Sequence, residues 1–287
     1  MESRIVETAG GRTKIRVYEG GEGPPLCFLP GASGLFPGDA FAAALATRFR
    51  VAVPILPGYE DSEGADNLRT MLDVTLWAFD ALAAIGLERP ILVGHSMGGM
   101  IAAEMAAVCP NEVERLVLVA PAGLWLDAHP IPDLFAALPF ELPQLLFHDV
   151  ALGVKLLTGG LPLDEMKSAV EEGGGFRLSV LLSRFEDTGF LQRFLIDSAR
   201  RLGMAGKLLF PIPDRGLAER LYRVRARTTL LWGAEDRLIV PAYAEAWQRA
   251  LPRARLVRVA QAGHMVPYER TDAVLDAIAA LAGEAVR

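Results

Sequence analysis

The chain has 287 residues, of which 52% are hydrophobic and 22% charged, a composition that allows a large folded core. Its net charge of −6 argues against nucleic-acid binding, which needs clustered basic charge. The N-terminus has no apolar signal-peptide segment, and no stretch of about 18 uncharged apolar residues predicts a membrane span. We therefore expect a cytoplasmic protein that binds neither nucleic acid nor membrane. The many Ala and Arg and few Lys are typical of a bacterial coding sequence.

In the first part of the chain, short apolar runs alternate with segments of helical spacing. The runs predict strands at 15–18, 25–29, 50–56, 90–94 and 115–120, and the spacing predicts helices at 39–49, 68–83 and 97–108. Apolar runs without polar alternation are typical of parallel strands that helices cover on both faces. We therefore expect an α/β fold with a doubly wound sheet.

The alternation stops at Pro121. Residues 124–212 are rich in Leu and Phe, lack a clear central strand, and are too apolar to remain solvated, which predicts a helical insertion. Helical fragments are expected at 132–137 and 190–202. The alternation then resumes, with strands expected at 228–232 and 255–259 and helices at 242–251 and 271–281. The sequence therefore predicts a core of residues 1–123 and 213–287 and a helical cap of residues 124–212.

The segment Gly94-His95-Ser96-Met97-Gly98 matches the pattern G-x-S-x-G between an apolar strand and an apolar helix. A serine on such a sharp turn has strained dihedral angles, and glycines on either side remove Cβ atoms that would collide. The turn also places Ser96 at a helix N-terminus, which favours negative charge. Ser96 is therefore the candidate nucleophile, whereas a turn that merely connects strand and helix is the alternative.

A serine nucleophile needs a base and a group that orients the base. Of the four histidines, only His264 follows a strand of the core; His95 adjoins Ser96 and would point elsewhere, and the other two lie in the insertion. Asp236 follows the strand at 228–232 and is the candidate acid, with Glu235 as its competitor. Because the carboxyl ends of parallel strands share one edge, we expect Ser96, Asp236 and His264 to meet there.

The candidate oxyanion hole uses backbone N–H groups. One donor is Met97, the residue after the nucleophile, and the other is Ala32 in the small-residue loop that follows the strand at 25–29. These groups require no cofactor. The cysteines, Cys27 and Cys109, have no metal-ligand spacing and are expected to be free thiols, so no metal site is predicted.

The segments PGASG, GHSMGG, WGAED and AGHMVPYER together resemble the α/β-hydrolase superfamily over nearly the whole chain. GHSMGG is similar to the elbow of bacterial family V esterases. The resemblance implies a mostly parallel, eight-stranded sheet with a helical cap after the sixth strand, and the chain order serine, aspartate, histidine. The chain differs from many relatives in having Pro30-Gly31 where they have His-Gly. Dehalogenases and epoxide hydrolases use an aspartate nucleophile, and Ser96 argues against both.

The resulting hypothesis is a carboxylesterase that forms an acyl-enzyme on Ser96 and acts on small to medium apolar esters. Apolar cap residues are expected to bind the acyl group, although packing on the core is the alternative for each: Phe135, Leu138, Phe140 and Leu146. Carbon–carbon bond hydrolysis of a vinylogous diketone uses the same triad, and lyase, acyltransferase or perhydrolase activity stays open. From another class, a non-catalytic ligand-binding protein on a hydrolase fold is also an alternative.

Overall fold

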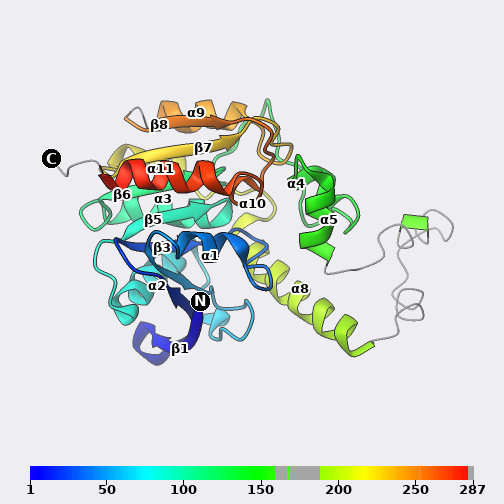
Figure 1. Ribbon diagram of the computed structural model, residues 1–287, viewed down its shortest axis with the longest axis horizontal. Helices are drawn as coiled ribbons and strands as arrows, with labels where there is room; N and C mark the ends of the chain where they lie inside the picture. Colours follow the sequence, from blue (N-terminus) through cyan, green and yellow to red (C-terminus); the bar gives the residue numbers. More distant parts are fainter. Residues whose placement is uncertain (159–166, 169–187, 252, 284–287) are drawn as a thin grey trace.

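In the computed structural model, strands and helices alternate along the chain and build one sheet with helices on both faces (Figure 1). The structure describes residues 1–158, 167–168, 188–251 and 253–283. The strands are β1 Glu2–Thr8, β2 Thr13–Gly20, β3 Pro25–Leu29, β4 Arg50–Pro54, β5 Ile91–His95, β6 Arg115–Val119, β7 Arg227–Gly233 and β8 Arg255–Val259. They form an 8-stranded sheet in the order β1-β2-β4-β3-β5-β6-β7-β8. The pairs β1–β2 and β2–β4 are antiparallel, and every pair from β4 to β8 is parallel.

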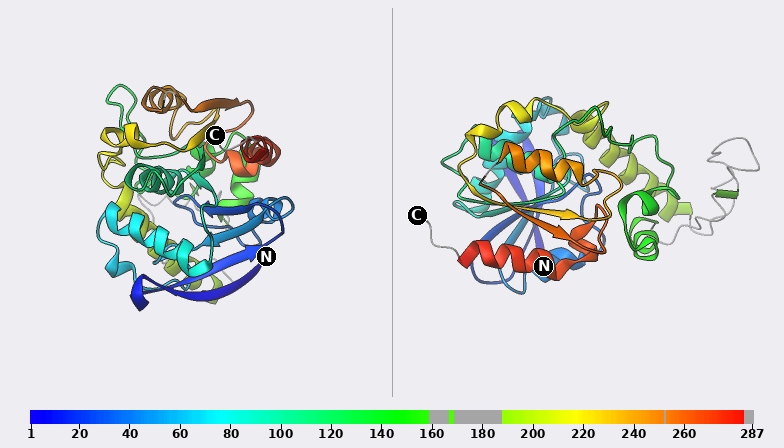
Figure 2. Two further views of the ribbon diagram at one scale, coloured as in Figure 1. Left: turned by 90° about the vertical axis from the view of Figure 1, so that its left-hand side faces the viewer. Right: turned by 90° about the horizontal axis from the view of Figure 1, so that it is seen from above.

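Most of the helices in the described part of the chain pack on the two faces of the sheet, and three lie at one end of it. The helices are α1 Ala40–Leu45, α2 Met71–Ile85, α3 Met97–Val108, α4 Leu142–Leu146, α5 Val150–Thr158, α8 Thr188–Leu209, α9 Ala242–Ala250, α10 Val266–Glu269 and α11 Thr271–Gly283. Figure 2 shows α1 and α11 on one face of the sheet and α2, α3 and α9 on the other. Strands β3, β5 and β6 are almost wholly buried between these layers, which explains their unbroken apolar runs.

Helix α2 shows how local sequence signals define an element. It begins after Thr70, whose side chain accepts from the Asp73 N–H while the Asp73 carboxylate accepts from the Thr70 N–H, a capping box. It ends at Gly86, which has φ of 77°, a conformation that glycine adopts without strain. Its apolar face, with Val74, Trp77 and Ala81, is buried against the core.

The predicted mostly parallel, eight-stranded α/β fold is confirmed, with two local differences. Strand β1 was not expected, because it is an edge strand of mostly exposed polar residues without a long apolar run. The helical fragment expected at 132–137 is wrong: these residues form a turn, in which the Asp133 carboxylate accepts from the N–H groups of Phe135 and Ala136. Cys27 and Cys109 are free thiols.

Residues 124–212, called here the inserted segment, lie between β6 and β7. Their described elements include α4, α5 and α8, which lie beside one end of the sheet (Figure 1). The expected helix at 190–202 falls within α8, and the segment boundaries at 123 and 213 stay a prediction. None of the helices in the described part of the chain is long and apolar enough to cross a membrane.

Candidate active site

Ser96 occupies a strained turn between β5 and α3. Its φ of 52° and ψ of −116° lie outside the usual regions for a residue with a side chain. The glycines around it allow this geometry: a Cβ on Gly94 would overlap the Gly98 carbonyl, and a Cβ on Gly98 would overlap the Leu29 carbonyl. The turn therefore requires small residues at both positions, and it packs directly against the end of β3.

The structure brings Ser96, His264 and Asp236 into one hydrogen-bonded chain. The Ser96 Oγ lies 2.8 Å from His264 Nε2, and His264 Nδ1 lies 2.9 Å from Asp236 Oδ2. All three side chains are buried, with 7%, 2% and 3% of the residue surface exposed, respectively. Each residue follows a strand end on the same edge of the sheet: β5, β8 and β7. The geometry matches what a hydroxyl nucleophile, a base and an orienting acid require.

The Asp236 carboxylate is held by backbone groups as well as by the histidine. Its Oδ1 accepts from the N–H groups of Leu238 at 2.9 Å and Ile239 at 2.8 Å. These bonds fix the carboxylate plane, so Oδ2 faces the imidazole. Because the carboxylate can only accept when ionised, His264 Nδ1 must carry the proton and Nε2 is free to accept from Ser96.

Glu235, the competing acid, has a different place in the structure. Its carboxylate accepts from the Ala262 N–H at 3.0 Å, and its own N–H donates to the Ala262 carbonyl. The Glu269 carboxylate similarly accepts from the Gly263 N–H at 2.8 Å. Glu235 and Glu269 therefore hold the backbone of the loop that carries His264, and this loop role was not expected from the sequence.

The loop that contains Ala32 passes beside Ser96. A Cβ on Gly31 would lie 3.2 Å from the Ser96 Cβ, so the backbone approaches the nucleophile closely. In the described part of the chain, no group accepts from the N–H of Ala32 or of Met97. Neither N–H is therefore occupied by another acceptor among the described residues, and their role as oxyanion donors stays a prediction.

The carbonyl groups of this loop accept hydrogen bonds both from outside the loop and from within it. The Tyr59 hydroxyl donates to the Ala32 carbonyl at 3.0 Å, and the Arg201 guanidinium of α8 donates to the Ser33 carbonyl at 3.2 Å. The Gly31 carbonyl accepts from the Gly34 N–H at 3.0 Å. Because C=O and N–H of one peptide plane point in opposite directions, these bonds also fix where the loop N–H groups point.

His95 precedes Ser96 and contacts the loop that carries His264. Its Nε2 is 3.0 Å from the His264 carbonyl oxygen. Burial, together with the neighbouring His264 ring, lowers the pKa of His95 from 6.5 to about 3. The ring is therefore neutral at physiological pH.

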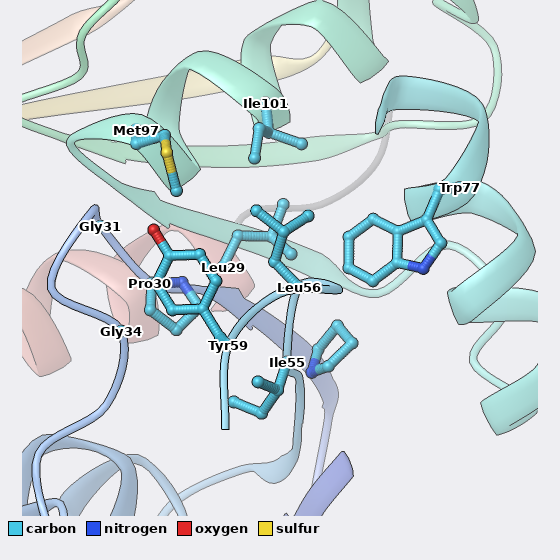
Figure 3. A pocket seen from close by; sticks show the side chains of 11 residues that line it. Leu29, Pro30, Gly31, Gly34, Ile55, Leu56, Tyr59, Trp77, Met97 and Ile101 are labelled. Carbon is cyan, nitrogen blue, oxygen red and sulfur yellow. The ribbon is translucent and has the colours of Figure 1, made fainter. Parts of the chain in front are cut away.

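An apolar pocket of about 350 Å³, including its mouth, opens next to the loop of residues 30–34 (Figure 3). Because this loop carries the candidate oxyanion donor Ala32, it is called here the oxyanion loop. Its walls come from the core: Leu29, Pro30, Gly31, Gly34, Pro54, Ile55, Leu56, Tyr59, Trp77, Met97 and Ile101. Figure 3 shows Met97 and Gly31 on one side of the pocket and Trp77 on the other, beyond Leu56. No lining residue is charged, so the pocket suits an uncharged apolar group.

The residues expected to bind the acyl group do not line this pocket. Phe135, Leu138 and Phe140 are partly buried in the inserted segment, and Phe135 packs edge-on against Phe210 with ring centroids 6.0 Å apart. Leu146 is buried, and its carbonyl accepts from the Met265 N–H. The lining of this pocket includes residues 54–56, which the sequence predicts only as the end of a strand.

The described residues contain no group of His, Cys, Asp or Glu side chains that could hold a metal ion.

A family model described as alpha/beta hydrolase fold matches residues 24–271.

Similar proteins of known name are hydrolases. A 2-hydroxy-6-oxononadienedioate/2-hydroxy-6-oxononatrienedioate hydrolase of Comamonas testosteroni is 25% identical, over 91% of this chain and 88% of its own. A 2-hydroxy-6-oxo-6-phenylhexa-2,4-dienoate hydrolase of the same organism is 25% identical, over 90% and 87%. The crystal structure of a bacterial membrane phospholipase A superposes with a TM-score of 0.65 at 25% identity, covering 97% of this chain and 86% of its own.

Proposed function

The chain belongs to the alpha/beta hydrolase fold family, and we propose that it is a serine carboxylesterase for small to medium apolar acyl groups. The observation that carries the proposal is the hydrogen-bonded chain from Ser96 through His264 to Asp236. Such a chain activates a hydroxyl that is otherwise a poor nucleophile at neutral pH.

In the proposed reaction, Ser96 Oγ attacks the ester carbonyl carbon while His264 Nε2 takes the hydroxyl proton. Asp236 stabilises the imidazolium that forms. The tetrahedral intermediate then collapses, the bond to the alcohol oxygen breaks, and His264 protonates the leaving alkoxide. Water attacks the acyl-enzyme with His264 again as base, which releases the acid and restores Ser96.

The oxyanion of both intermediates would be stabilised by the N–H groups of Ala32 and Met97. Donors that are already oriented avoid reorganisation during the reaction, and one such donor contributes about 100-fold to 1,000-fold in kcat. The bond from the Gly34 N–H to the Gly31 carbonyl supports this assignment, because that carbonyl shares its peptide plane with the Ala32 N–H. The bonds to the Ala32 and Ser33 carbonyls hold the next two peptide planes of the loop before substrate arrives.

We propose that the apolar pocket beside Gly31 and Met97 receives the acyl group. Both residues line the pocket and flank the oxyanion position, so a group bound there is adjacent to the attacked carbonyl. Phe135, Leu138, Phe140 and Leu146 remain candidates for contacts on the side of the inserted segment.

Carbon–carbon bond hydrolysis is the second candidate, because the relatives at 25% identity carry names of dienoate and dienedioate hydrolases. Those names denote substrates with carboxylate groups. The lining of the pocket offers no cationic side chain to such a group, and the Arg201 guanidinium donates to the Ser33 carbonyl. The uncharged lining therefore favours the ester over the dienoate.

The test measures the turnover of p-nitrophenyl esters of graded chain length by the wild type and by Ser96→Ala. The same two proteins are assayed with a 2-hydroxy-6-oxo-dienoate for comparison. Esterase activity that Ser96→Ala loses, with faster turnover of the ester than of the dienoate, supports the proposal. Faster cleavage of the dienoate favours the second candidate. Ligand binding without turnover of either substrate contradicts both and favours a binding protein.

A further inference from the structure

We propose that His95 is a positioning residue for the catalytic base: its Nε2–H holds the backbone carbonyl of His264. The inference rests on the proposed function, in which His264 is that base. His95 would thus act through His264 and not on the substrate.

The contact is short and buried. His95 Nε2 and the His264 oxygen are 3.0 Å apart, and the two residues expose only 3% and 2% of their surface. A carbonyl can only accept, so His95 must carry its proton on Nε2. The two rings lie with centroids 5.1 Å apart and planes inclined at 43°, which places them beside each other without stacking.

Because of the position of His95 in the chain, this contact links the nucleophile to the base. His95 is the last residue of β5, and Ser96 follows it directly. One rigid strand end therefore carries the nucleophile and also holds the backbone of the base. The distance between Ser96 Oγ and His264 Nε2 is then set within the core.

The other backbone contacts of the histidine loop include bonds to the inserted segment. The Met265 N–H donates to the Leu146 carbonyl, and Glu269 accepts from both the Gly263 N–H and the Asp149 N–H. Leu146 and Asp149 belong to the inserted segment. The His95 bond comes instead from the central sheet, so it holds His264 independently of that segment.

His95 also packs against the oxyanion loop, since a Cβ on Gly31 would lie 3.0 Å from His95 Nδ1. A replacement must therefore keep a similar width. Gln and Asn have planar side chains of similar width, but their amide N–H groups lie at different distances from the backbone. The amide nitrogen of Gln corresponds to Nε2 of histidine, whereas that of Asn corresponds to Nδ1.

The experiment compares His95→Gln and His95→Asn with wild type in ester turnover. We expect His95→Asn to lower kcat about 10-fold to 100-fold with little change in KM, because a base displaced by even 1 Å can cost about 100-fold. His95→Gln should retain kcat within a few-fold, since its N–H reaches the same carbonyl. Circular dichroism and thermal melting identify variants that fold. Equal kcat values for two folded variants would overturn the proposal.

A second readout needs neither activity nor a variant. In ¹⁵N-histidine NMR spectra of the wild type, His95 should be the neutral Nε2–H tautomer and should not titrate between about pH 5 and 8. An Nδ1–H tautomer, or titration in this range, would overturn the proposal. This result is separate from the proposed function, which fails if the wild type has no hydrolytic activity while the tautomer is as expected.

Discussion

The catalytic edge of the sheet and the inserted segment are held in different ways. Ser96, Asp236 and His264 each follow a parallel strand of the sheet, and backbone bonds fix the turns that carry them. The inserted segment rests on this edge through contacts such as Arg201 to the Ser33 carbonyl and Met265 to the Leu146 carbonyl. The core therefore fixes the positions of Ser96, Asp236 and His264, whereas a connecting segment such as the inserted one generally tolerates more sequence variation.

The largest expected effect on kcat comes from replacing Asp236, the candidate acid. Asp236→Asn should lower kcat about 10,000-fold with little loss of stability. The amide oxygen must face the N–H groups of Leu238 and Ile239, so the NH₂ group meets His264 and forces its proton from Nδ1 to Nε2. Esterase kinetics and thermal melting measure both quantities.

Glu235→Gln is the matched control for this change. Its amide oxygen can still accept from the Ala262 N–H, so kcat should stay within a few-fold of wild type. A loss comparable to that of Asp236→Asn would show that the acid has been assigned to the wrong residue.

A pair of glycine substitutions compares the two regions directly. Gly98→Ala places a Cβ against the Leu29 and Pro30 carbonyls, so it should lower kcat at least about 100-fold by displacing the oxyanion loop. Gly203→Ala, in helix α8, meets no atom within 4 Å and should stabilise the protein by about 1 kcal/mol. Kinetics and urea unfolding test the pair; equal effects on kcat would contradict the comparison.

The stability of the core should depend on pH through His95. Its pKa is lowered from 6.5 to about 3 by folding, so the unfolded state binds more protons below pH 6.5 and stability falls as pH falls. Between pH 7 and 5 this group should cost the wild type about 2 kcal/mol relative to His95→Gln, which has no titrating ring. Urea unfolding of both proteins at the two pH values measures the difference. If the free energy of unfolding changes with pH by the same amount in the wild type and in His95→Gln, folding does not lower the pKa of His95.

The smallest expected effect concerns the link between Tyr59 and the oxyanion loop. Tyr59→Phe removes the bond to the Ala32 carbonyl and keeps the packing, so kcat should fall about tenfold with KM nearly unchanged. Tyr243→Phe is the control, because that hydroxyl donates to the His129 carbonyl, away from Ser96. A similar loss of kcat in both variants would indicate a general packing effect.

Ser96, Asp236 and His264 meet at one edge of the sheet, as the sequence predicts, because the signals for their positions are local. The glycines around Ser96 and the apolar run of β5 mark the elbow, and Asp236 and His264 follow runs that end at the same edge. In a parallel sheet, the position of a residue after its strand already determines its place in space.

The pocket and the roles of His95 and Glu235 could not be predicted in the same way. They depend on contacts between residues far apart in sequence, such as His95 with His264 and Tyr59 with Ala32. In residues 132–137, the Asp133 side chain closes a turn in a stretch whose apolar residues favoured a helix. Short apolar stretches do not distinguish a helix from a turn that packs on a core.

The central claim is that Ser96 is an activated nucleophile. Its most direct test is reaction of the full chain with a fluorophosphonate, followed by mass spectrometry of the digested protein. We expect one phosphonyl group per chain, on Ser96, and strongly slowed labelling in Asp236→Asn. Absence of an adduct, or an adduct on another residue with Ser96 unmodified, would contradict it.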